Sequence, residues 1–317
     1  MTPPRPDQPS IAGTDQQKFR SGLLYAFGAY VLWGVLPLYF LALVPAGAFE
    51  IVAWRILFSL VFCAVLITVT RSWGRFLAIA RQPRLLLLIG LAGVLIYVNW
   101  QTYILGTLSG QVVEASLGYF INPIVTVLLG VLVLRERLRV LQWVAIGVSA
   151  VSVVVLTVGY GSVPWIALIL AASFGLYGLV KKYVGPSVDA VSGLSLETAW
   201  LMPVAVVQLI VVSQISGLTF GDGAVHTTLL VLSGVATAIP LLLFASAARR
   251  LPLVYVGFIQ FIAPILQFAI GVFVLKEPMP PERWFGFAIV WLAVAILVVD
   301  MARAGRSARS EPLGPVS

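Results

Sequence analysis

The sequence predicts an all-α polytopic membrane protein with ten transmembrane helices, arranged as two inverted five-helix repeats. Three observations predict this fold class: an apolar composition, ten segments long enough to cross a bilayer, and a segment that recurs in the second half of the chain. Of the 317 residues, 60% are hydrophobic and 10% are charged, and the mean hydropathy is +1.03. Because soluble domains carry about 25% charged residues, this composition excludes a soluble globular protein.

Ten apolar segments meet the length requirement for a transmembrane helix, which is about 20 residues for about 30 Å of hydrocarbon. The alternation of polar and apolar residues that is typical of a membrane β-barrel is missing from them. Several connections are short, so neighbouring helices are expected to form antiparallel hairpins. The predicted helices span residues 21–43, 49–70, 85–108, 113–134, 140–158, 163–182, 190–214, 227–248, 253–275 and 283–301.

Lysine and arginine residues concentrate in the two tails and in alternate loops, such as the loop with Arg71, Arg75, Arg81 and Arg84. Cytoplasmic loops collect these residues, so both termini are predicted to be cytoplasmic. The net charge of +8 is then a consequence of topology and does not indicate a nucleic-acid partner. The polar tails, residues 1–20 and 302–317, are predicted to be disordered.

One segment of the first half recurs in the second half with the same spacing of a proline, a glycine, an acidic residue and a tryptophan. The paired positions are Pro123 and Pro264, Gly130 and Gly271, Glu136 and Glu277, and Trp143 and Trp284. This duplication predicts repeats at 21–158 and 163–301, and the odd number of helices in each makes the second repeat inverted. Inverted repeats are typical of secondary transporters that bind substrate near the bilayer midplane.

Several stretches resemble the RarD-like permeases of the EamA-type family, within the drug/metabolite transporter superfamily. The resemblance covers about residues 20–302, and EASLGYFINP (Glu114–Pro123) and LETAWLMPVA (Leu196–Ala205) are its most specific stretches. The others are Ala29–Phe40, Glu50–Arg55, Asn99–Trp100, Val133–Arg137, Ser173–Lys182 and Gly257–Pro264. The resemblance implies a permease of the bacterial inner (plasma) membrane, of a group associated with efflux of metabolites or drugs such as chloramphenicol.

Three ionisable residues at or within the predicted spans are candidates for transport, because charge in hydrocarbon is costly and often functional. Arg55 either pairs with Glu50 at the helix end or attracts an anionic group. Glu197 has no basic residue in its own helix, so it either stays protonated beside a polar neighbour or couples transport to protons. Glu114 either caps a helix N-terminus or takes part in coupling.

Aromatic and amide side chains near helix centres form a predicted substrate wall. Pro123 and Pro264 each remove a backbone hydrogen bond and are predicted to mark equivalent helix bends. Freed carbonyls are tolerated where neighbours satisfy them or where they line a cavity. Each aromatic taken alone fits a packing role more often, whereas the whole set favours a midplane cavity. The predicted substrate-binding residues are Tyr30, Trp33, Arg55, Asn99, Trp100, Tyr103, Tyr119, Asn122, Phe258 and Gln260.

The remaining sequence features narrow the function to transport without a cofactor. The chain has one cysteine, Cys63, and one histidine, His226, and it carries no P-loop for ATP hydrolysis. We therefore expect no metal and no cofactor, with protons as the candidate coupling ion. The predicted substrate is a small amphipathic solute: an amino acid, an aromatic metabolite or a neutral drug. The alternatives are a membrane-embedded enzyme and a non-transporting scaffold, and the expected state is a monomer or weak homo-oligomer.

Overall fold

The computed structural model describes residues 11–135, 138–184, 187–248, 250–251 and 253–310. These residues are almost entirely helical and contain no β-strand. Ten spans within them are long and apolar enough to cross a membrane, and they correspond to the ten predicted segments. The all-α membrane fold class is therefore confirmed.

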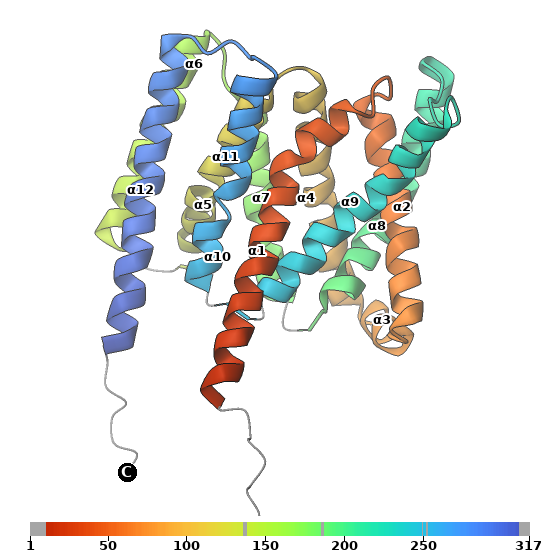
Figure 1. The fold of residues 1–317 in the computed structure, drawn as a ribbon, viewed down its shortest axis with the longest axis horizontal. Helices are drawn as coiled ribbons and strands as arrows, with labels where there is room; N and C mark the ends of the chain where they lie inside the picture. Colours follow the sequence, from red (N-terminus) through yellow and green to blue (C-terminus); the bar gives the residue numbers. More distant parts are fainter. Residues whose placement is uncertain (1–10, 136–137, 185–186, 249, 252, 311–317) are drawn as a thin grey trace, which may run out of the picture.

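Twelve α-helices and one π-helix make up the described chain (Figure 1). Their bounds are α1 Ile11–Leu41, α2 Ala48–Val69, α3 Trp73–Ala80, α4 Pro83–Leu108, α5 Val112–Leu134, α6 Val140–Tyr160, α7 Trp165–Val184, α8 Ala190–Ile215, α9 Ala224–Ala248, α10 Leu253–Ile259, α11 Ile262–Ala269, η1 Ile270–Val274 and α12 Pro281–Ser310.

The first and last helices extend beyond the predicted spans. Because α1 begins at Ile11 and α12 continues to Ser310, residues 11–20 and 302–310 of the predicted disordered tails are helical. The flanking residues include Ala, Gln, Lys and Arg, which favour helix and carry it past the hydrocarbon. Residues 1–10 and 311–317 lie outside the described residues. The free ends of both helices lie at the same end of the bundle (Figure 1).

The predicted span 253–275 is not one helix. It is divided into α10, α11 and η1, with the interruption at Gln260 and Phe261. Pro264 explains the position, because its ring lacks an N–H and clashes with the carbonyl of the residue four positions earlier, which is Gln260. In contrast, α5 passes through Pro123 as one continuous helix. The two prolines therefore have different backbone surroundings.

The helices pack in pairs that join the two halves of the chain. α2 packs against α8 and α9, α1 against α9 and α11, and α5 against α7 and α11, while α6 and α12 pack together at one edge (Figure 1). Glycine permits the closest approach. A Cβ atom on Gly234 of α9 would lie 2.3 Å from the backbone carbon of Phe58 in α2. Small residues of this kind let membrane helices approach closely enough for van der Waals packing.

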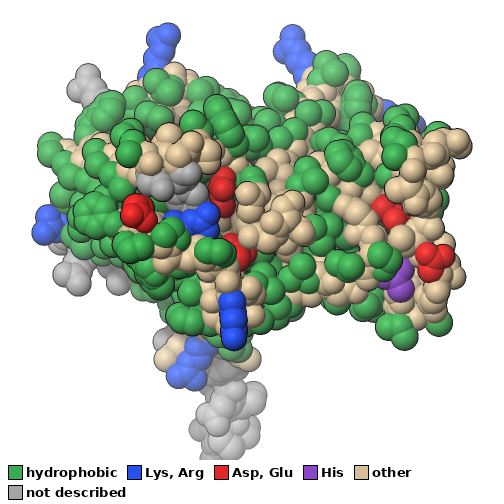
Figure 2. Space-filling model, turned by 90° about the horizontal axis from the view of Figure 1, so that it is seen from above, with side chains coloured by type: hydrophobic (Ala, Val, Ile, Leu, Met, Phe, Trp, Pro, Cys, Tyr) green, Lys and Arg blue, Asp and Glu red, His purple; other side chains and the backbone are tan. Residues whose placement is uncertain are grey.

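The end of the bundle remote from the termini carries few charged side chains. Seen from that end, acidic and basic side chains lie together in one place, and acidic side chains lie beside the single histidine in another, among mainly hydrophobic side chains (Figure 2). The opposite end includes the short helix α3, which lies between α2 and α4 where the sequence suggested only a loop. Ile79 of α3 is buried together with Ile89, Val184 and Leu196.

Candidate functional site

Arg55 of α2 is buried in the middle of the helix bundle, with 4% of its surface exposed. Its Nε donates to Thr237 Oγ1 of α9 at 2.6 Å. Its Cζ lies 4.3 Å from the ring centroid of Trp100 and 5.5 Å from that of Phe40. The predicted pairing with Glu50 does not occur; the partner of Arg55 is Thr237, and the alternative, attraction of an anionic group, stays a prediction.

Two tyrosines and an asparagine lie beside this arginine. Tyr119 of α5 donates to Asn99 Oδ1 at 3.0 Å, and the Tyr119 ring is 5.6 Å from that of Tyr103, edge to face. Asn99 in turn donates to the Leu170 carbonyl and to Ser173 Oγ of α7, both at 3.2 Å. The structure thus brings five of the predicted binding residues into one buried cluster, which we call the arginine cluster: Arg55, Asn99, Trp100, Tyr103 and Tyr119.

A line of aromatic rings connects the arginine cluster to the second buried charge. Tyr119 contacts Phe174 at a centroid distance of 6.0 Å, and Phe174 contacts Tyr177 at 5.9 Å. Tyr177 then donates a hydrogen bond to Glu197 Oε2 at 3.3 Å. The two charged positions are therefore joined by direct contacts along α7.

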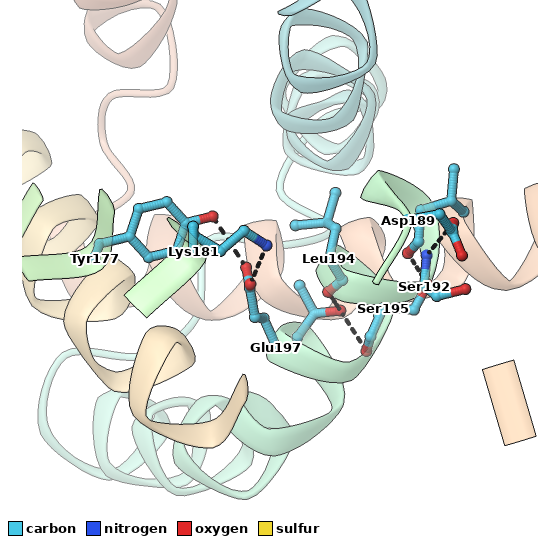
Figure 3. Close-up of polar contacts among 9 residues, drawn as sticks. Tyr177, Lys181, Asp189, Ser192, Leu194, Ser195 and Glu197 are labelled. Atoms are coloured by element: carbon cyan, nitrogen blue, oxygen red, sulfur yellow. Dashed lines mark hydrogen bonds and ion pairs between the residues drawn. The ribbon is translucent and has the colours of Figure 1, made fainter. Parts of the chain in front are cut away.

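Glu197 of α8 is not alone, as its helix suggested. Lys181, in the last turn of α7, donates to Glu197 Oε1 at 2.7 Å (Figure 3). The exposed fractions of the side chains are 2% for Glu197 and 32% for Lys181. The expectation of a carboxylate without a basic partner was wrong, because that partner belongs to the neighbouring helix. Figure 3 also shows Asp189 capping α8 through the Ser192 amide, at a separate position along α8.

The remaining predicted binding residues lie elsewhere. Tyr30 and Trp33 of α1 form their own aromatic group with Phe244 of α9, with centroid distances of 5.2–6.1 Å. Trp33 borders both this group and the core that contains the arginine cluster. The carbonyl of Trp33 accepts from Gln267 of α11 at 3.1 Å.

Within the described chain, the side chains of three further predicted residues make no hydrogen bond or ring contact with the arginine cluster. Asn122 is buried and its Oδ1 lacks a hydrogen-bond partner among the described residues, beside Gly175 of α7. Phe258 and Gln260 lie in and just after α10 and are partly buried. Phe258 therefore precedes the interruption of the predicted span, and Gln260 lies within it.

Three carboxylates at the end remote from the termini cap backbone N–H groups of the opposite half; we call Glu50, Glu114 and Glu277 the capping glutamates. Glu114 accepts from the amide of Ile166 in α7 at 2.9 Å, so it caps a neighbouring helix instead of its own. Glu277 accepts from Val112 at 2.6 Å and from Val113 at 2.9 Å, at the start of α5. Negative charge is favourable at such helix N-termini.

Glu50 completes this set through the loop before α9. It accepts from the amides of Thr219 at 2.9 Å and Phe220 at 3.2 Å, and from the Thr219 hydroxyl at 3.1 Å. Burial raises the pKa of the Glu277 carboxyl. The hydrogen bonds from the two backbone amides oppose this rise in pKa. All three contacts join residues of the first five spans to residues of the last five.

An ion pair joins the two halves at the other end. Arg139, before α6, donates from Nε to Asp300 Oδ1 of α12 at 2.8 Å. This bond to the carboxylate raises the pKa of Arg139. Glu136, the counterpart of Glu277 in the duplicated segment, lies outside the described residues.

Sequence reasoning missed the partners that complete these sites, namely Lys181, Tyr177 and Thr237. Lys181 and Lys182 lie at the end of the predicted span 163–182, where lysines indicate topology, so they were not considered as partners of Glu197. A signal was available for Tyr177 and Lys181, since four residues place them on one helix face. No local pattern indicates Thr237. Within the described chain, no group of three or more His, Cys, Asp and Glu side chains could hold a metal ion.

Comparisons with known proteins agree with this architecture. Residues 20–158 match the EamA-like transporter family. The chain is 47% identical to the protein RarD of Streptomyces exfoliatus over 92% of both chains. It is 30% identical to the chloramphenicol-sensitive protein RarD of Pseudomonas aeruginosa, covering 89% of this chain and 95% of that one. A solved crystal structure shares the fold, with a TM-score of 0.58 at 19% identity, over 89% of this chain and 99% of the other.

Proposed function

Because this chain belongs to the RarD-like EamA family of drug/metabolite membrane transporters, we propose that it exports a small amphipathic solute across the bacterial inner membrane. Candidate solutes are an amino acid, an aromatic metabolite or a chloramphenicol-like compound. The last of these rests on the name of one relative, a chloramphenicol-sensitive protein. We also propose that both termini are cytoplasmic, as the distribution of lysine and arginine among the loops predicts.

The observation that carries the proposal is the arginine cluster, a polar and aromatic group buried between transmembrane helices of both halves. Arg55, Asn99 and Tyr119 come from three helices of the first half, and their partners Thr237 and Ser173 come from the second half. Intramembrane ionisable residues that face the bundle interior mark substrate or ion pathways. We assign substrate contact to this cluster, with Tyr30, Trp33, Asn122, Phe258 and Gln260 as further candidates.

Transport by alternating access would use the two repeats as its moving parts. The duplicated segments share a feature that supports an inverted repeat: Arg135 and Lys276, at equivalent positions, both adopt the left-handed conformation, with φ of 56° and 54°. Both lie at the end of a helical segment. Rocking of inverted repeats around a midplane site is a common route of alternating access.

Proton coupling is proposed at the contact of Lys181 with Glu197. A buried carboxylate whose cation lies on another helix can exchange that cation for a proton when the helices separate. Tyr177 links this pair to the arginine cluster through Phe174, which provides a physical connection between the two sites. Glu114 is a weaker coupling candidate, because its carboxylate already caps α7.

Counterflow in proteoliposomes tests the function. The purified chain would be reconstituted and screened with radiolabelled amino acids, aromatic metabolites and chloramphenicol, with and without a pH gradient. Saturable flux stimulated by the gradient is the expected result, and Glu197→Gln should abolish the stimulation while leaving exchange. Flux that ignores the gradient would remove proton coupling. A complete lack of flux would favour the scaffold alternative.

The enzyme alternative is the less favoured one. The EamA family and the RarD relatives are transporters. A membrane enzyme needs a metal centre or a nucleophile beside a base. The buried charged side chains of the described chain instead pair with a hydroxyl, a lysine, an arginine or backbone amides.

A further inference from the structure

The guanidinium of Arg55 has N–H donors that make no hydrogen bond among the described residues. Among the described residues only its Nε makes a hydrogen bond, to Thr237, and neither terminal nitrogen meets an acceptor. Among the described residues, no carboxylate lies within ion-pair distance of it. The tyrosines near enough to interact with its charge are Tyr119, Tyr103 and Tyr39. Arginine stays protonated in proteins, so this site holds a buried positive charge without an anionic partner.

Such a charge is costly unless it is paired, because the interior cannot replace the water that it loses. The face of Trp100, 4.3 Å from Cζ, offsets part of this cost through a cation–π contact. It leaves the two terminal nitrogens unused, since a ring face accepts no directed hydrogen bond from both. The Nε bond to Thr237 holds the plane of the guanidinium in one orientation.

Tyr103 provides a second unused donor beside the first. Its side chain is 3% exposed, and its hydroxyl has no hydrogen-bond partner among the described residues. Its ring contacts those of Phe40 and Tyr119, at 6.0 and 5.6 Å, and the ring of Phe40 also lies below Arg55. Because Phe40 contacts both side chains, the hydroxyl and the guanidinium lie in the same part of the bundle.

From these contacts we propose that the transported solute is an organic anion whose carboxylate is bound by the terminal nitrogens of Arg55 and by the hydroxyl of Tyr103. A planar carboxylate with two oxygens matches the fork of a guanidinium, and such pairs form the stronger charge-assisted hydrogen bonds. The rings of Phe40, Trp100 and Tyr119 suit a flat apolar body attached to the carboxylate. This inference rests on the proposed transport function and narrows its substrate class.

A matched solute series tests the charge requirement: 3-phenylpropanoate, its primary amide and its methyl ester. In proteoliposome counterflow, the carboxylate should compete with the radiolabelled solute at a concentration about 10-fold or more lower than the amide or the ester requires. One charge-assisted contact accounts for a difference of this size. Arg55→Gln should remove this preference, and Arg55→Lys, which keeps the charge without the planar fork, should restore only part of it. Tyr103→Phe should weaken carboxylate competition by about 10-fold.

Tyr97→Phe is the matched control, because this hydroxyl lies on the same helix and accepts from Gln208 outside the arginine cluster. It should leave the carboxylate preference unchanged. Binding is read separately as thermal stabilisation of the detergent-solubilised wild-type protein by each member of the series. This reading does not depend on transport or on the folding of any variant.

The outcomes separate the inference from the function. Stabilisation by 3-phenylpropanoate alone, without flux, would support the carboxylate site and remove the transporter. Flux of the ester and the amide equal to that of the carboxylate, unaltered by Arg55→Gln, would overturn the inference and leave the transporter. Equal stabilisation by inorganic phosphate would also overturn it, because the site would then bind anions without selecting a carboxylate.

Discussion

Replacing Lys181 by Met removes the cation from the buried ion pair with Glu197 while keeping a side chain of similar length. Removing one partner of a buried pair costs about 3–5 kcal/mol. Since Lys181 is 32% exposed, water screens part of the interaction and we expect a loss of about 2–3 kcal/mol. At about 2–4 °C per kcal/mol, the unfolding midpoint should fall by roughly 5–10 °C.

The double variant separates the pair from its members. Glu197→Gln should destabilise by a similar amount, because it leaves the ammonium without its carboxylate. Lys181→Met combined with Glu197→Gln removes both charges together, so its loss should be smaller than the sum of the single losses by about 1–3 kcal/mol. Lys181→Arg keeps the charge and should preserve most of the stability.

The single cysteine supplies the assay. Cys63 is 1% exposed in α2, so a thiol-specific fluorogenic maleimide reacts only when the bundle opens. Heating the protein in detergent with this reagent gives one midpoint for each variant. Lys18→Met is the matched control, since it removes an exposed lysine and should move the midpoint by less than 2 °C or so. Equal midpoints for Lys18→Met and Lys181→Met, or additive single losses, would refute the proposed strength of the pair.

Three further changes test other features. Gly234→Ala would place a methyl group against the Phe58 backbone, which cannot move aside as a side chain can, and should cost about 1–3 kcal/mol in the same thermal assay. Glu277→Gln leaves one acceptor for two amides and should cost about 1–2 kcal/mol, with faster amide exchange at the start of α5; unchanged exchange would contradict the cap. Pro264→Ala restores an N–H at the interrupted span and should alter counterflow more than Pro123→Ala does, and equal effects would show that the interruption has no role.

The sequence predicted the spans well because length and hydropathy decide membrane insertion almost alone. Ten apolar segments became ten spans, within a few residues at most boundaries. The errors occur where polar residues continue a helix into water, as at the start of α1, and where one proline interrupts a span. Pro264 and Pro123 give the same local sequence signal, but the helix is interrupted only near Pro264. The surrounding helices decide whether a helix tolerates the lost hydrogen bond.

The sequence indicated several residues that the structure brings together, but it did not indicate their partners. Arg55, Asn99 and Tyr119 were selected as polar or aromatic residues in apolar helices, and the structure places them together. The partner of Arg55 is Thr237 and that of Glu197 is Lys181; both contacts depend on how two helices are rotated about their axes. Apolar helices that face lipid as well as protein carry little periodic signal for that rotation.

The two ends of the bundle differ in how they would tolerate mutation. The contacts nearer the termini join side chains, so a charge-reversing change at Glu197 or Asp300 has a natural suppressor in the reciprocal change at Lys181 or Arg139. The capping glutamates bind backbone amides, which every residue except proline possesses. Substitution of their partners therefore leaves the amide contacts intact, and loss of Glu277 has no reciprocal rescue. Genetic screens should find compensating pairs at one end and only irreplaceable single residues at the other.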